Sequence, residues 1–198
     1  MKYTTILDYW FGKVERDEDI AKDKQSLWFQ GGKEVDIYII EHFKNALEEA
    51  KKGALNEWKE TPRQRLALII LLDQFSRNIY RNNPQMYESD SLSLELCTKG
   101  IEQEMDCKLF PVYRQFFYMP LQHVEDLTSQ QKSVELYTQL KNDAPQSTKE
   151  YFAMAVKSAK RHCEIIELFG RFPHRNKILG RLSTAEEKAF LETPDSSF

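Results

Sequence analysis

The chain has 198 residues, of which 41% are apolar and 30% charged, and its formal net charge is −3 at pH 7. This length predicts a single domain over residues 1–198, which can bury about 70% of its unfolded surface and needs neither a disulfide nor a metal ion to fold. The acidic balance argues against proteins that bind nucleic acid or a membrane surface, because both need a net positive field.

Helical spacing of apolar residues recurs along the chain, and most of the seven Gly and seven Pro residues fall between the helical segments. Asp36 is predicted to cap the first of these helices, and Gly53 follows its end. The predicted helices cover residues 36–52, 61–81, 91–104, 111–118, 129–141, 148–169 and 185–191. Patterns typical of capping boxes occur at residues 61–64, 128–131 and 147–150. Gly170 is expected to end the longest helix.

Strand signals are nearly absent, since no Asn-Gly or Asp-Gly turn occurs and no long segment alternates apolar and polar residues. The sequence therefore predicts an all-α fold without a β-sheet. No GxGxxG, GxxxxGKS/T, GxSxG or HExxH motif is present, so the sequence points to no particular cofactor.

The amino-terminal segment lacks the apolar stretch and cleavage site of a secretory signal. The longest apolar run, residues 66–72, is far shorter than the roughly 20 residues that span a membrane, so no membrane partner is expected. The three cysteines lie far apart and form no CxxC pair, which is typical of reduced thiols in the cytoplasm.

Two basic segments stand out in this acidic chain. Residues 61–81 carry a net charge of +3 and residues 157–181 a net charge of +5. If the two segments meet in space, they form a pocket that attracts anions. The alternative is that their arginines form ordinary ion pairs with carboxylates of neighbouring helices, which are common and weak.

Asp73 and Arg77 lie four residues apart, on one face of a predicted helix and directly after its apolar run. Arg77 can offer two parallel donors to a phosphate or carboxylate while Asp73 fixes its orientation. An ion pair that only fixes the position of the helix is an equally good interpretation.

A second polar group follows Pro120, where His123, Glu125 and Asp126 fall within four positions. An imidazole beside two carboxylates can carry out general acid–base catalysis. A metal site would need a second histidine from elsewhere, which only His162 or His174 could supply, so no metal site is predicted.

The segment after Gly170 is stiffened by Pro173 and displays Arg171, His174 and Arg175 from a constrained loop. Such a loop is typical of a binding site. The alternative is that these cations bond the last carbonyls of the preceding helix. His162 shares a helix face with apolar residues and is expected to point into the core.

The sequence resembles the bacterial family catalogued as domain of unknown function 924 over nearly its whole length. The resemblance rests on Trp28-Phe29, the spacing from Gly53 through Trp58 to Thr61-Pro62, LALIILLDQFSRNIYR at 66–81, MPLQHVED at 119–126, HCEIIELFGRFPHRN at 162–176, Leu179-Gly180-Arg181, Ser183-Thr184, Glu187 and Phe190-Leu191. One departure is Val124, where the family usually has Ser.

The resemblance implies an all-helical fold of stacked antiparallel hairpins, similar to tetratricopeptide repeats. It implies no particular activity for the chain. It also marks a set of polar positions as parts of the family pattern: Asp73, Arg77, Asn78, His123, Glu125, Asp126, His162, Arg171, His174, Arg175 and Arg181.

Three hypotheses follow from these residues. In the first, a basic pocket binds an anionic small molecule or the acidic end of a peptide, with ligand contacts from Asp73, Arg77, Asn78, His162, Arg171, His174, Arg175 and Arg181. In the second, His123, Glu125 or Asp126 transfers protons in the same pocket, with or without a metal. In the third, the chain is a protein-interaction scaffold with exposed aromatic residues at Trp10, Phe11, Trp28 and Phe29.

Overall fold

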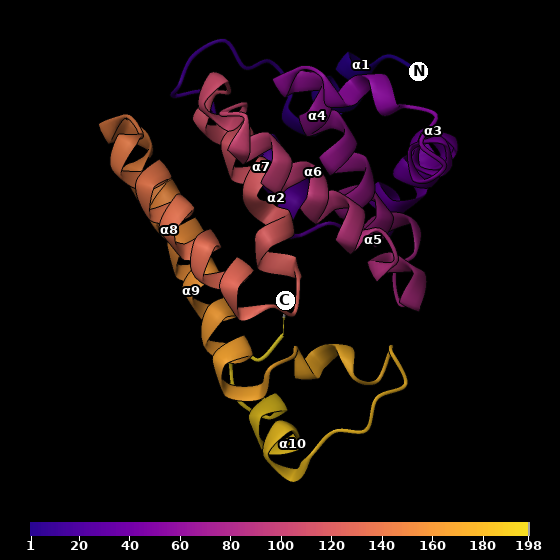
Figure 1. Cartoon of the computed structure of the whole chain (residues 1–198), viewed down its shortest axis with the longest axis vertical. Coiled ribbons are helices and arrows are strands. Elements are labelled where there is room, and N and C mark those ends of the chain that lie inside the picture. The colour runs from indigo at the N-terminus through magenta and orange to yellow at the C-terminus, as the bar shows by residue number, and fades with distance from the viewer. Residues whose placement is uncertain (198) are drawn as a thin grey trace.

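The computed structural model describes residues 1–197, and that part of the chain contains helices and no β-strand (Figure 1). The α-helices are α1 (Tyr3–Phe11), α2 (Lys22–Phe29), α3 (Lys33–Lys51), α4 (Pro62–Ile69), α5 (Ser76–Ile79), α6 (Asp90–Glu102), α7 (Pro111–His123), α8 (Leu127–Asp143), α9 (Lys149–Phe169) and α10 (Ala185–Leu191). The 3-10 helices are η1 (Asn56–Lys59), η3 (Pro84–Tyr87), η4 (Asp106–Lys108), η5 (Gln146–Thr148) and η6 (Pro173–Arg175), while η2 (Ile70–Phe75) is π-helical. None of the helices formed by residues 1–197 is long and apolar enough to cross a membrane.

Several predicted boundaries are confirmed. The helix predicted from residue 61 begins with Pro62 as its first residue, and α10 has the predicted bounds. Gly170 ends α9 with a left-handed φ of 66°, a conformation that glycine adopts without the steric cost of a Cβ atom. Helices α1 and α2 were not predicted from the sequence.

Other predicted boundaries are wrong. Helix α3 begins at Lys33 because Gly32 is its N-cap, and Asp36 lies in the first turn instead of capping it. Helix α7 does not end near residue 118 but continues through Pro120 to His123. The N-cap of α8 is Asp126, whose Oδ2 accepts a hydrogen bond from the backbone of Ser129 at 2.8 Å, so residues 128–131 form no capping box.

The predicted capping boxes at residues 61–64 and 147–150 do not form either. The Thr61 hydroxyl donates to the side chain of Gln64 at 2.7 Å and caps no backbone group, and the N-cap of α9 is Thr148, which makes no side-chain cap. A capping box does form at α10, where Thr184 and Glu187 bond each other's backbone N–H groups.

Aromatic side chains build much of the core. Trp10 and Phe11 of α1 are 2% and 1% exposed, and both pack edge-on against Phe116 of α7. Trp28 is half-buried, whereas Phe29 is 57% exposed. The expectation of an exposed aromatic surface is therefore wrong for Trp10 and Phe11, because these residues hold α1 onto the rest of the fold.

Helices α7, α8 and α9 pack beside one another, and α8 and α9 form the long hairpin at the left of Figure 1. Helices α8 and α9 each reverse the direction of the preceding helix, so α7 and α9 run in the same direction. The chain after Gly170 folds below this group, where Phe172 joins a small apolar cluster with the end of α9. This layout places the carboxyl-terminal ends of α7 and α9 next to η6.

Candidate functional site

A cavity of about 570 Å³ lies between the amino-terminal helices, the α5–α6 connection, α7, α9 and η6. Its basic lining consists of three arginines and three histidines: Arg77, Arg81, Arg175, His123, His162 and His174. Among the described residues, no Asp or Glu lines it. The two basic segments of the sequence therefore do meet, and they meet at this cavity.

Asp73 lies directly behind the cavity wall, on the π-helical segment η2. Its side chain is fully buried and accepts hydrogen bonds from His123 Nδ1 at 2.7 Å and from Gln74 Nε2 at 2.5 Å. Burial alone raises the pKa of the Asp73 carboxyl, but the His123 ring and the Arg77 guanidinium outweigh this and hold the pKa well below its ordinary value. Asp73 is thus a carboxylate that orients His123 and leaves its other ring nitrogen, Nε2, for a molecule in the cavity.

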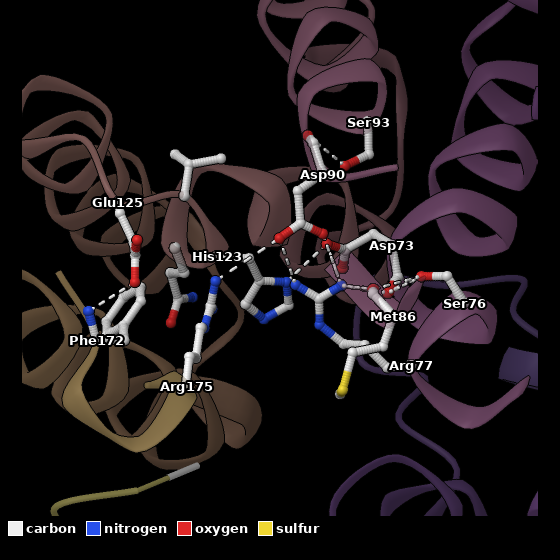
Figure 2. A network of polar contacts seen from close by, with 12 residues as sticks. Asp73, Ser76, Arg77, Met86, Asp90, Ser93, His123, Glu125, Phe172 and Arg175 are labelled. Carbon is white, nitrogen blue, oxygen red and sulfur yellow. Dashed lines mark hydrogen bonds and ion pairs between the residues drawn. The ribbon is translucent and has the colours of Figure 1, made fainter. Parts of the chain in front are cut away.

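Arg77 is fixed from several sides (Figure 2). It donates to both carboxylate oxygens of Asp90, at 2.9 and 3.2 Å, and to the backbone oxygen of Asp73 at 2.9 Å. Asp90 is the first residue of α6, where a negative charge also interacts favourably with the helix dipole. The π-helical segment η2 ends two residues before Arg77. A π-helical turn changes the direction of the side chains around it, and such turns are frequent at functional sites.

Arg175 comes from the opposite basic segment and points toward the same carboxylate (Figure 2). Its guanidinium lies 4.6 Å from the ring centre of Tyr87 and 4.4 Å from that of Phe172, and its Nη1 is 3.7 Å from Asp90 Oδ2. Burial and the nearby charge of Arg77 lower the pKa of Arg175, although a guanidinium stays charged at neutral pH. Its Nε has no hydrogen-bond partner among the described residues.

His162 and His174 are neutral at pH 7. Burial is the main cause and the charge of Arg175 adds to it, so the pKa of His162 falls to about 3 and that of His174 to about 4. His162 Nδ1 donates to the backbone oxygen of Ser158 at 2.8 Å, and its ring centre is 6.4 Å from that of His123. The buried position of His162 is as predicted.

The remaining carboxylates and arginines of the sequence prediction lie outside the cavity lining. Glu125 accepts hydrogen bonds from both terminal nitrogens of the Arg181 guanidinium, at 2.6 and 2.8 Å, and from the backbone N–H of Phe172 at 2.8 Å. Arg171 forms the same kind of pair with Glu187, at 2.6 and 2.8 Å. These contacts fasten the segment after Gly170 to the α7–α8 junction and to α10.

Two further predicted site residues have separate roles. Asp126 caps α8 and lies outside the cavity lining. Asn78 lines the cavity and donates to Asp36 at 2.9 Å.

The sequence profile of a family described as bacterial proteins of unknown function, DUF924, matches residues 6–195. The chain belongs to this family. A solved structure of a protein of unknown function from Agrobacterium tumefaciens has 33% sequence identity and a TM-score of 0.82, and the match covers 96% of each chain. No curated protein matches the chain.

In this member of the DUF924 family, sequence reasoning missed several residues that build the cavity. Asp90 accepts hydrogen bonds from Arg77, and the ring of Tyr87 packs against the guanidinium of Arg175. Arg81 lines the cavity and donates to Asp36 at 2.6 Å. Gln74 donates to Asp73. The only available signal was the acidic residue at the start of α6, which is common at helix starts. Within residues 1–197, no three His, Cys, Asp or Glu side chains cluster closely enough to hold a metal ion.

Proposed function

We propose that this member of the DUF924 family binds a small organic anion in the cavity, with the carboxylate or phosphate next to Arg77 and Arg175. The observation that carries the proposal is the cavity lining, which has three arginines and three histidines and no carboxylate among the described residues. The anionic partners of the arginines, Asp36, Asp73 and Asp90, stand behind them.

Arg175 favours a ligand over a purely structural ion-pair network. Its closest carboxylate oxygen is 3.7 Å away and belongs to Asp90, which is already bound by Arg77 through two hydrogen bonds. Its Nε is a buried donor without a partner among the described residues, which costs about 1–3 kcal/mol. An anion bound to the guanidinium would offset part of this cost through its charge. A structural arginine is normally satisfied within the fold, as Arg171 and Arg181 are.

The rest of the lining favours an organic body over inorganic phosphate alone. Apolar and aromatic side chains make up about half of it, including Trp28, Met119 and Met154. Cavities of about 300–1,000 Å³ with an apolar lining and a few polar groups are typical of small-molecule sites.

The test is a thermal-shift measurement with hexanoate, benzoate and phenyl phosphate on the purified protein, on Arg175→Met and on Arg161→Met. Arg161 is a matched control because it is also partly buried and ion-paired but lies outside the cavity. A ligand at 100 times its Kd stabilises the folded state by about 2.7 kcal/mol, which raises the midpoint by about 5–10 °C. We expect Arg175→Met to lose this shift and Arg161→Met to keep it. Equal shifts in both variants would contradict the proposal.

A second candidate function is proton transfer by His123, and the Asp73–His123 pair favours it. A buried carboxylate at 2.7 Å fixes the tautomer and the orientation of the imidazole, which is how a catalytic histidine is prepared to act as a base. In this function the arginines hold the anionic group of the substrate while His123 Nε2 accepts a proton from water or from the substrate.

This second candidate is tested with chromogenic anionic esters, the 4-nitrophenyl monoesters of phosphate and succinate. Turnover by the wild-type protein should fall by about 10²–10⁴ in His123→Gln, because general-base catalysis contributes that much. The affinity for benzoate should stay the same, since His123 acts on the reaction rather than on binding. Turnover that survives in His123→Gln, or an absence of turnover in the wild type, removes this candidate.

A further inference from the structure

A second group of polar residues lines the same cavity but belongs to other positions on its helices. Trp10 Nε1, Gln115 Oε1 and Tyr151 Oη are buried and have no hydrogen-bond partner in the part of the chain that the structure describes. Trp10 and Gln115 are 2% and 3% exposed, and all three residues line the cavity. None of them belongs to the arginine and histidine group.

The parallel course of α7 and α9 shows how far apart the two groups are. His123 and His162 lie next to each other near the ends of these helices, with ring centres 6.4 Å apart, and Ser158 bonds Gln122 one turn earlier. Gln115 precedes His123 by eight residues, about 12 Å along α7 at 1.5 Å per residue. Tyr151 precedes His162 by eleven residues, about 16 Å along α9.

Gln115 and Tyr151 are neighbours at the end of the cavity away from the histidines. Burial raises the pKa of the Tyr151 hydroxyl, and the Gln115 side chain is close enough to lower it in turn, so the hydroxyl stays protonated and can donate. Trp10 packs against Phe116, the residue next to Gln115, and so belongs to this end as well. Together the three residues offer an indole N–H, an amide and a hydroxyl, all uncharged.

The stretch between the two ends is mostly apolar, and the polar pair Ser158 and Gln122 lies next to the histidines. Met119 of α7 lies between Gln115 and His123, and Met154 and Ala155 of α9 lie between Tyr151 and His162. Methionine side chains adapt to ligands of different shapes without demanding a specific partner. The cavity therefore has a cationic end, an apolar middle and an uncharged hydrogen-bonding end.

We propose that the ligand is an elongated organic anion: a carboxylate or phosphate at one end, an apolar chain in the middle, and an amide or similar uncharged donor–acceptor group at the other. This inference rests on the proposed anion-binding function and adds the far end of the ligand to it. The amide bonds Tyr151 and Gln115 while the anion bonds Arg175.

The experiment compares two probes, 8-acetamidooctanoate and decanoate, which share the carboxylate and differ at the far end. Isothermal titration is carried out on the wild type, on Tyr151→Phe and on Arg175→Met. Tyr151→Phe removes only a hydroxyl whose polar neighbour is the uncharged Gln115 side chain, so the variant keeps its packing.

We expect Tyr151→Phe to weaken 8-acetamidooctanoate by about 3–10-fold, the net value of one hydrogen bond, and to leave decanoate unchanged. Arg175→Met should weaken both probes. If Tyr151→Phe changes both probes by the same factor, or neither, the inference is overturned while the anion site stands. If neither probe binds the wild type, the inference is overturned together with the proposed function.

Discussion

Asp90 is the carboxylate that Arg77 and Arg175 share, so Asp90→Asn disturbs the centre of the candidate site with a minimal change of shape. The variant keeps the volume of the side chain and one oxygen that can accept a hydrogen bond from Arg77. It removes the negative charge that faces two buried guanidinium groups at 2.9 and 3.7 Å.

The expected loss of stability follows from the burial of this network. The side chains of Asp90, Arg77 and Arg175 are 13%, 18% and 8% exposed, so solvent screens them little. Removing one partner of a buried pair costs about 3–5 kcal/mol. Asp73 remains 3.6 Å from Arg77 and compensates part of its charge, so we expect about 2–3 kcal/mol. For a chain of this size the melting midpoint then falls by about 4–12 °C.

The assay is thermal denaturation with and without phosphate, with Glu135→Gln as the control. Glu135 pairs with Lys132 on the surface, where the side chains are 66% and 44% exposed, and its replacement should leave the midpoint unchanged. Because Asp90→Asn leaves Arg77 and Arg175 short of negative charge, phosphate should stabilise this variant more than the wild type. An unchanged midpoint together with an unchanged response to phosphate would refute the reasoning.

Three further predictions concern stability. The pKa values of His162 and His174 lie near 3 and 4, so below pH 6.5 the unfolded chain binds protons more strongly than the folded chain does. The free energy of unfolding, measured by urea titration, should therefore not change through these two histidines above pH 6.5. Toward pH 4 it should fall by up to about 1.4 kcal/mol per pH unit for each histidine. A profile for His162→Gln that parallels the wild type would show that burial of this ring is not the cause. Glu125→Gln breaks the pair with Arg181, so amide hydrogen exchange in residues 171–182 should accelerate by about tenfold or more, whereas unchanged protection would mean that other contacts hold this segment. Gly100→Ala should destabilise the fold by about 1–3 kcal/mol in urea titrations although alanine favours helices, because its Cβ would overlap the ring of Phe117, and Phe117→Leu should restore part of the loss.

Much of the fold is predictable because helix starts, helix ends and apolar spacing are local signals. Pro62, Gly170 and the bounds of α10 were predicted from such signals. The two basic segments were also visible in the sequence, but whether they meet in space was not. Helices α1 and α2 were missed because they are short, with nine and eight residues, and because α2 buries none of its residues completely.

The division of the arginines between ligand and structure could not be predicted from the sequence. Arg171, Arg175 and Arg181 fall in one short segment, yet two of them bind Glu187 and Glu125 while Arg175 reaches the cavity. The partners are distant in sequence, and the choice depends on the backbone path around Pro173. The π-helical turn at Asp73 is equally invisible, because apolar residues surround it on all sides and give no periodicity to read.

The most direct test of the anion site is a crystal structure of the protein soaked with selenate, whose anomalous signal locates the ion without reference to any reaction. The account predicts a selenate oxygen within hydrogen-bond distance of the Arg175 guanidinium, between Arg175 and Arg77, and no such peak in Arg175→Met. Selenate found only at surface lysines, with the guanidinium of Arg175 still facing Asp90 alone, would contradict it.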